Sequence, residues 1–196
     1  MRNLLNSIGG QIHRNTCFPI LQQEFRGDCS VDNFRFEVMH FPEEWGFENI
    51  MHECSQVFVN FGQWPASWGS QPVPWEFLRY RQGIKAFLKM LVETQKRHHH
   101  LKITWVSTNP HPIMQSQMSC PPIDWRFPHV IDMYNHIARE ELGAVGGSIG
   151  YLDAYEIALP LLDLSFDMAH YQGPVGVALA HAFASCILGD CTSIAQ

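Results

Sequence analysis

The pattern with the clearest chemical meaning is an acid three positions before a histidine, Asp167 and His170, just ahead of Gly173-Pro174. In a turn, this spacing lets the carboxylate accept a hydrogen bond from the imidazole Nδ1–H and fix the tautomer of the ring. The other ring nitrogen can then take a proton from a nucleophile. A helix start close by disfavours the imidazolium and keeps such a base neutral. The pattern predicts a general base, and a capping aspartate beside a structural histidine is the simpler alternative.

A second candidate lies where an apolar run meets a glycine. Residues 57–61 read Val-Phe-Val-Asn-Phe, and Gly62, Gln63 and Trp64 follow them. A glycine lets the backbone N–H come close to a developing oxyanion, and the side chain of Asn60 or Gln63 could add a donor. The alternative is a tight turn packed by Trp64.

Other candidates are weaker. His111 follows the third predicted strand and is a candidate substrate contact. Trp64, Trp68 and Trp75 could stack on sugar rings, although core packing of at least two of them is the safer expectation. The histidines at 98–100 point in different directions at a predicted helix end, which favours a solvated cap over a metal site. We expect no metal and no cofactor.

The elements that must position these residues follow from hydrophobic periodicity. The expected strands are residues 34–39, 57–61 and 103–106, and the expected helices are residues 75–97, 130–142 and 175–188. We expect Gly143 to cap the second helix and Pro174 to lie in the first turn of the third. Strand, helix and strand in succession predict a βαβ crossover and a parallel sheet. We therefore predict one domain over residues 1–196, a three-layer α/β sandwich.

Composition narrows the partners. The chain of 196 residues is 46% apolar with a formal charge of −6, and Lys96-Arg97 stands alone as a basic pair. A nucleic-acid partner requires a basic footprint, so we expect none. No apolar stretch reaches the length of a membrane span. The six cysteines do not form the paired CxxC motifs of a zinc site, and Cys17 and Cys29 bracket a short loop that a disulfide could close, which favours slightly a secretory or extracellular compartment.

Taken together, the two chemical patterns resemble a known family. In this order and separation they are similar to the PC-esterase branch of the SGNH (GDSL-like) hydrolases, which includes the plant trichome-birefringence-like polysaccharide O-acetyltransferases. Members carry a Gly-Asp-Ser block, then an apolar strand ending in Asn-x-Gly-x-Trp, then Asp-x-x-His before the last helix. Asn60, Gly62 and Trp64 match the second block, and Asp167 and His170 match the third.

The chain departs from the family in two places. The Gly-Asp-Ser block is absent, and residues 1–5 resemble the stretch that directly follows it, so we expect the first strand and the nucleophilic serine to lie upstream of Met1. Cys191, in Gly-Asp-Cys, follows the final helix and is poorly placed to replace that serine. In addition, Trp64 stands where many SGNH hydrolases have an oxyanion-donating asparagine, so that donor must come from Asn60, Gln63 or elsewhere.

The resemblance implies an acyl-ester hydrolase or O-acetyltransferase acting on small-molecule or carbohydrate esters. In that role His170 is the base, Asp167 orients it and the Gly62 N–H holds the oxyanion. The alternative is a catalytically inactive pseudoenzyme that binds glycans or a protein. Neither the acyl group nor the acceptor follows from the sequence.

Overall fold

The computed structural model describes residues 16–19, 34–37, 55–67, 75–112, 124–164, 171 and 173–189; for residues 16–19, 34–37 and Trp64 it describes the backbone alone. Asp167, His170, Trp68 and Cys191 lie outside the described residues.

A five-stranded sheet forms the middle of the molecule. Its strands are β1 (Thr16–Pro19), β2 (Phe34–Glu37), β3 (Gln56–Val59), β4 (Lys102–Val106) and β5 (Gly150–Leu152). They lie in the order β2-β1-β3-β4-β5, and every neighbouring pair is parallel. From β1 the chain goes first to β2 at one edge and then crosses to β3 on the other side of β1. The strand order therefore reverses between β1 and β3, and their carboxyl ends form the switch point at which open α/β sheets bind ligands.

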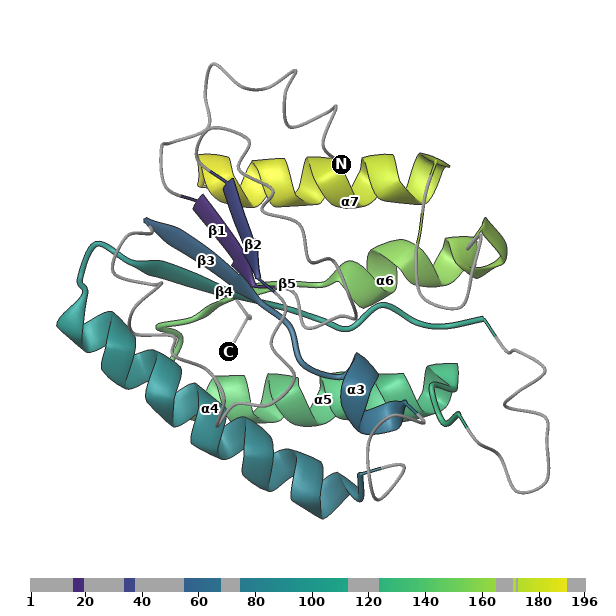
Figure 1. Cartoon of the computed structure of the whole chain (residues 1–196), viewed down its shortest axis with the longest axis horizontal. Helices are drawn as coiled ribbons and strands as arrows, with labels where there is room; N and C mark the ends of the chain where they lie inside the picture. Colours follow the sequence, from purple (N-terminus) through teal and green to yellow (C-terminus); the bar gives the residue numbers. More distant parts are fainter. Residues whose placement is uncertain are drawn as a thin grey trace.

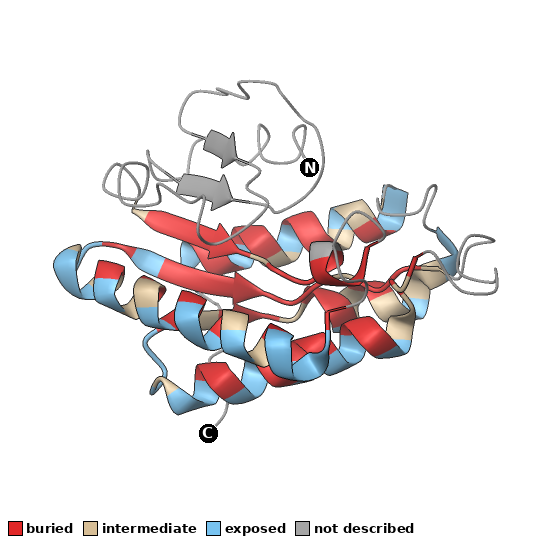
Figure 2. Ribbon diagram, turned by 60° about the horizontal axis from the view of Figure 1, so that its bottom comes forward, coloured by how far each residue is buried: buried red, intermediate tan, exposed pale blue. Residues whose placement is uncertain are grey.

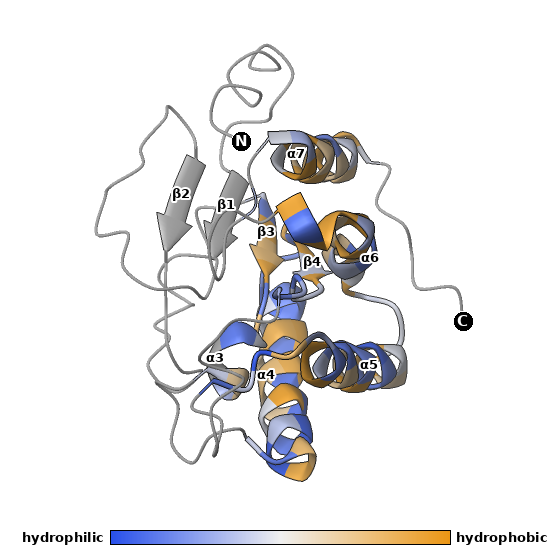
Figure 3. Ribbon diagram, turned by 90° about the vertical axis from the view of Figure 1, so that its right-hand side faces the viewer, coloured by the Kyte–Doolittle hydropathy of each residue, from blue (hydrophilic) through white to orange (hydrophobic). Residues whose placement is uncertain are grey.

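Helices cover both faces of the sheet. They are α3 (Gln63–Ala66), α4 (Phe77–Arg97), α5 (Pro128–Ala144), α6 (Ala154–Ala158), the 3-10 helix η3 (Leu159–Leu164) and α7 (Gly173–Leu188). Figure 1 shows α6 and α7 on one side of the sheet and α3, α4 and α5 on the other, and the end view of Figure 3 shows the same three layers. The predicted three-layer α/β sandwich with a parallel sheet is confirmed.

Each layer has its own core because successive strand side chains point to opposite faces of the sheet. Val57 and Val59 of β3 pack with α4 and α5, whereas Phe58 between them packs with α7. Strands β3, β4 and β5 are buried along nearly their whole length, and the helices show exposed residues on their outer faces (Figure 2). Burial on both faces explains why these strands read as continuous apolar runs.

The predicted βαβ crossover is confirmed as β3, α4 and the parallel β4. Pro174 lies in the first turn of α7, as expected. Gly143 does not cap α5, however, because the helix continues through it to Ala144. The glycines with positive φ lie further on, at Gly146 and Gly147, and these leave the helical path.

Two further predictions concern a membrane span and the pairing of the cysteines. Among the helices that the structure describes, none is long and apolar enough to cross a membrane. Cys186 on α7 is disulfide-bonded. The side chains of Cys17 and Cys29 lie outside the described residues, so their pairing stays a prediction.

Candidate functional site at the carboxyl edge of the sheet

The bend after β3 is built around Asn60. Its Nδ2 donates to the Val106 carbonyl oxygen at 2.8 Å and to Thr108 Oγ1 at 3.0 Å. Both N–H groups of the amide are therefore engaged with the end of β4 and the segment that follows it. Asn60 joins two neighbouring strand ends, and no N–H of this side chain is left for an oxyanion.

Gly62 is required by the close approach of Thr108. A Cβ built on Gly62 would lie 2.1 Å from Thr108 Oγ1, a separation that real side chains do not tolerate. Any other residue at position 62 would have to push the two segments apart. Glycine is therefore fixed here by packing, and its backbone lies directly against the segment after β4.

Thr108 is itself held from α5 by Asn135. The Thr108 N–H donates to Asn135 Oδ1 at 2.8 Å, and Asn135 Nδ2 donates back to the Thr108 carbonyl oxygen at 2.9 Å. The amide side chain thus satisfies both backbone groups of a buried loop residue, as a neighbouring strand would. The sequence analysis did not identify Asn135; a buried polar residue within the apolar stripe of a helix was the available signal.

Gln63 adds a hydrogen bond between the bend after β3 and the segment after β4. Its Nε2 donates to the Asn109 carbonyl oxygen at 3.0 Å. The Gln63 Oε1 and the Asn109 Oδ1 are both buried and have no hydrogen-bond partner among the described residues. Of the two amide side chains expected at the bend, Gln63 is the one that keeps an uncommitted N–H, since a single hydrogen bond uses only one of its two.

The short helix α3 anchors the ends of two long loops. The Trp75 N–H donates to the Pro65 carbonyl oxygen at 2.8 Å, and the Trp125 N–H donates to the Ala66 carbonyl oxygen at 3.0 Å. Trp75 is buried in the core against Phe61, so it packs rather than offering a surface for sugars. The side chains of Trp64 and Trp68 lie outside what the structure describes.

His111 is buried rather than exposed at the sheet edge. Its side chain is 1% exposed and lies near Asp124, which forms a buried ion pair with Arg126. Burial alone raises the pKa of Asp124, but the hydrogen bonds and charge of Arg126, helped by His111, hold that pKa below its usual range. In this arrangement His111 belongs to the packed support of the loop, and its contact with substrate stays a prediction.

Two hydroxyl groups at this edge serve structural roles. Ser107 Oγ donates to Asp153 Oδ1 at 3.0 Å and accepts from the Tyr155 N–H at 2.8 Å, which fixes the start of α6. Thr108 Oγ1 accepts from Asn60. Neither hydroxyl lies beside a described histidine in the manner of an activated nucleophile. Within the described part of the chain, no cluster of His, Cys, Asp and Glu could hold a metal ion, and the exposed histidines 99 and 100 form a helix-end turn.

The residue that follows the predicted base in the sequence contacts this edge. Tyr171, the residue after His170, donates its hydroxyl to the Pro110 carbonyl oxygen at 2.6 Å. Burial raises the pKa of Tyr171 to about 12, so the hydroxyl remains a donor at physiological pH. Pro110 directly follows Asn109, the residue that receives Gln63. The segment after β4 is therefore tied both to the Gly62 bend and to the residue beside His170.

The sequence matches no family model and no curated protein. Solved structures do share its fold. A lipase/acylhydrolase from Enterococcus faecalis has a TM-score of 0.61 at 13% identity, over 94% of this chain and 100% of that one. A mutant of Axe2, an acetyl-xylooligosaccharide esterase from Geobacillus Stearmophilus, has a TM-score of 0.56 at 13% identity, over 91% and 95%.

A third similar structure is LAE5, an alpha/beta hydrolase enzyme from the metagenome of Lake Arreo, Spain, with a TM-score of 0.53 at 10% identity, over 91% of this chain and 97% of that one. At these identities the likeness establishes the fold. It is the SGNH-hydrolase-like α/β sandwich expected from the sequence. The PC-esterase branch and the position of the nucleophile upstream of Met1 stay predictions.

Proposed function

We propose that the protein is an acyl-ester enzyme of the SGNH type, in the PC-esterase branch, acting on carbohydrate esters as a hydrolase or an O-acetyltransferase. The observation that carries the proposal is the double attachment of the segment after β4. Gln63 of the bend bonds to Asn109, and Tyr171, beside His170, bonds to Pro110. His170 directly precedes Tyr171 in the sequence.

The proposed chemistry divides between the two attached segments. A serine supplied from upstream of Met1 attacks the ester carbonyl carbon, and His170, oriented by Asp167, takes the serine proton. The Gly62 N–H donates to the oxyanion of the tetrahedral intermediate. Collapse breaks the ester C–O bond, and His170 returns the proton to the leaving alcohol. Water then releases the acid from the acyl-enzyme, or a sugar hydroxyl accepts the acyl group.

Gly62 is our choice of oxyanion donor because the alternatives are engaged elsewhere. Both Asn60 N–H groups already donate, and one Gln63 N–H does so. The second Gln63 N–H is the remaining side-chain candidate. The bend also follows β3 at the switch point of the sheet, where ligands of such folds bind. Two of the similar structures are named an acylhydrolase and an acetyl-xylooligosaccharide esterase, which favours an ester and a carbohydrate as substrate.

The test is release of acetate from p-nitrophenyl acetate and from acetylated xylo-oligosaccharides. It compares the 196-residue chain with a form extended upstream through the natural reading frame. We expect turnover from the extended form and a loss of about 10²–10⁴-fold in kcat for His170→Ala. The matched control is His181→Ala, at an exposed position of α7. An inactive extended form that contains Gly-Asp-Ser, or an unaffected His170→Ala variant, would sink the proposal.

The absence of a Gly-Asp-Ser block from these 196 residues favours one other candidate, an inactive protein that binds glycans or another protein through the same edge. It predicts no in-frame serine block upstream and glycan binding that weakens in Trp64→Ala and Trp68→Ala. Isothermal titration with xylo-oligosaccharides separates the two candidates.

A further inference from the structure

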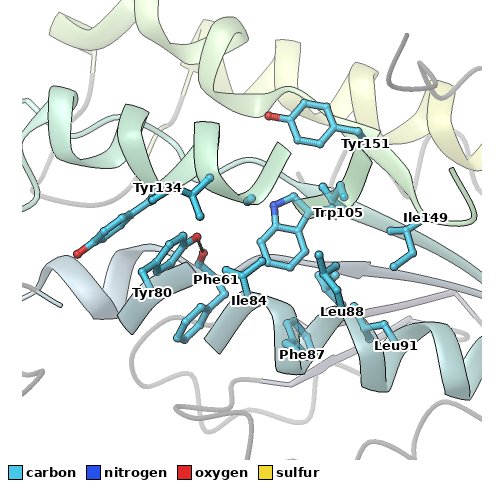
Figure 4. Packing of buried hydrophobic residues seen from close by; sticks show 14 of the residues in the cluster. Phe61, Tyr80, Ile84, Phe87, Leu88, Leu91, Trp105, Tyr134, Ile149 and Tyr151 are labelled. Atoms are coloured by element: carbon cyan, nitrogen blue, oxygen red, sulfur yellow. Dashed lines mark hydrogen bonds between the residues drawn. The ribbon is translucent and has the colours of Figure 1, made fainter. Parts of the chain in front are cut away.

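A tyrosine hydroxyl holds the peptide group that contains the proposed oxyanion donor. Tyr80, on α4, donates its hydroxyl to the Phe61 carbonyl oxygen at 2.6 Å (Figure 4). Tyr80 is 0% exposed and Phe61 is 1% exposed, so no water competes for this bond. The Phe61 carbonyl and the Gly62 N–H belong to the same peptide group.

The planarity of that group transmits the restraint. In a trans peptide the C=O and the N–H point in opposite directions within one rigid plane. Because Tyr80 draws the Phe61 carbonyl toward α4, the Gly62 N–H points away from α4. Helix α7, which Tyr171 precedes, covers the opposite face of the sheet (Figure 3). The Tyr80 hydroxyl therefore sets the direction of the Gly62 N–H, and it does so from the α4 side of the peptide, opposite to the side on which we propose the reaction.

Aromatic packing holds the tyrosine ring in place. Tyr80 stacks on Phe61 with centroids 5.9 Å apart and planes 1° apart, and on Tyr134 with centroids 4.1 Å apart and planes 16° apart. Rings on both sides prevent the phenol from swinging away from the carbonyl. Burial, together with the neighbouring tyrosines, raises the pKa of Tyr80 well above its ordinary value, so the hydroxyl keeps its proton at neutral pH.

We propose that Tyr80 is a positioning residue that fixes the Phe61–Gly62 peptide with its N–H directed toward the oxyanion. The role of this N–H toward an oxyanion rests on the proposed function, whereas the orientation of the peptide rests on the Tyr80 hydrogen bond alone. Without the hydroxyl, the peptide loses the hydrogen bond that holds its carbonyl toward α4. A rotated peptide would present a carbonyl dipole that repels the developing negative charge.

The orientation is measured directly by NMR on the ¹⁵N-labelled full chain. Residual dipolar couplings of the Gly62 N–H are compared in the wild type, Tyr80→Phe and Tyr134→Phe. Tyr134 is the matched control, because its hydroxyl donates to the Trp75 carbonyl oxygen at 2.7 Å and its ring belongs to the same stack. We expect the Gly62 coupling to change or its signal to broaden in Tyr80→Phe alone. An unchanged coupling in folded Tyr80→Phe overturns the proposal.

Should Tyr80→Phe fail to fold, the wild type provides the test. A hydroxyl bonded to a buried carbonyl exchanges slowly, so the Tyr80 Oη–H should give a visible resonance with a nuclear Overhauser contact to Phe61. A Tyr80 hydroxyl proton in fast exchange with water overturns the proposal.

Kinetics separate this inference from the proposed function. In an active extended form, we expect Tyr80→Phe to lower kcat about 10–100-fold, less than the full loss of an oxyanion donor, with KM within about twofold. Tyr134→Phe should keep kcat within about threefold. If no form hydrolyses esters, the proposed function fails while the NMR result still stands or falls by itself. Changes of equal size in both variants would mean that Tyr80 acts only through stability.

Discussion

The two faces of the sheet are packed in different ways. On the α4 and α5 face, a large aromatic cluster includes Phe61, Tyr80 and Tyr134, and its hydroxyl groups bond to backbone carbonyls of the bend and its neighbouring loop. On the α6 and α7 face, the cluster that the described residues form around Phe58 and Phe183 is smaller and contains several alanines. Among the described residues, the Tyr171 hydroxyl and the start of α6, through Ser107, bond this face to the segment after β4.

This difference separates two tasks of the proposed site. The bend that carries the Gly62 N–H is fixed by Tyr80, by the approach of Thr108 and by the amides of Asn60 and Asn135. Preorganised donors stabilise an oxyanion because they do not have to reorient during the reaction. Beside the predicted acid–base segment, the described contact with this support is the Tyr171 hydroxyl bond to Pro110. We therefore expect substitutions on the α4 and α5 face to be the more damaging ones.

The largest expected effects come from two matched phenylalanines. Phe87 of α4 contacts Trp105 edge to face at 5.9 Å, and Phe183 of α7 contacts Phe58 edge to face at 5.1 Å. Truncating a buried aromatic to alanine costs about 3–5 kcal/mol of unfolding free energy. We expect Phe87→Ala near the upper end and Phe183→Ala near the lower end, measured by urea unfolding. An equal or larger cost for Phe183→Ala would contradict the contrast between the faces.

A smaller effect is expected at Gly62. In Gly62→Ala the new methyl group meets Thr108 Oγ1, and overpacking of this kind costs about 1–3 kcal/mol. The control is Gly83→Ala within α4, where the Cβ would find only Trp75 at 3.5 Å and the better helix propensity of alanine gains up to about 1 kcal/mol. Thermal unfolding should therefore move in opposite directions for the two variants. A neutral Gly62→Ala would show that the bend is not tightly packed.

The smallest effect concerns the tyrosines on both faces. All five have raised pKa values, with burial as the leading cause, and Tyr155 and Tyr171 reach about 12. A pKa that is higher in the folded than in the unfolded chain contributes stability below pH ~10, which is lost as the pH rises through the folded values. Absorbance at 295 nm should show little tyrosinate at pH 10 in the native protein. A normal ionisation curve near pH 10 would contradict the burial of these hydroxyls.

Elements were predictable where their residues show a helical period or form a continuous apolar run. Helix α4 and strands β3 and β4 lie within two residues of their expected bounds. Strands β1 and β5 were not predicted, because Thr-Cys-Phe-Pro and Gly-Tyr-Leu form neither a continuous apolar run nor a clear alternation. Helix α6 did have a signal: Asp153 accepts from the Glu156 N–H as an N-cap residue.

The site was predictable only in part. The glycine turn after β3 was identified, but the reason for its glycine, the approach of Thr108, is a contact between segments 46 positions apart. Tyr80 reads as one apolar residue in a helical stripe, and only the folded structure brings its hydroxyl to Phe61. Such long-range hydrogen bonds leave no local spacing in the sequence.

The most direct test of the account asks whether His170 and Gly62 face the same site. The Gly62 amide shift is followed by NMR as a function of pH in the wild type, in His170→Gln and in the control His111→Gln. We expect the Gly62 amide to shift with the ionisation of His170, and this titration to vanish in His170→Gln but persist in His111→Gln. A Gly62 amide that titrates identically in all three proteins would contradict the account.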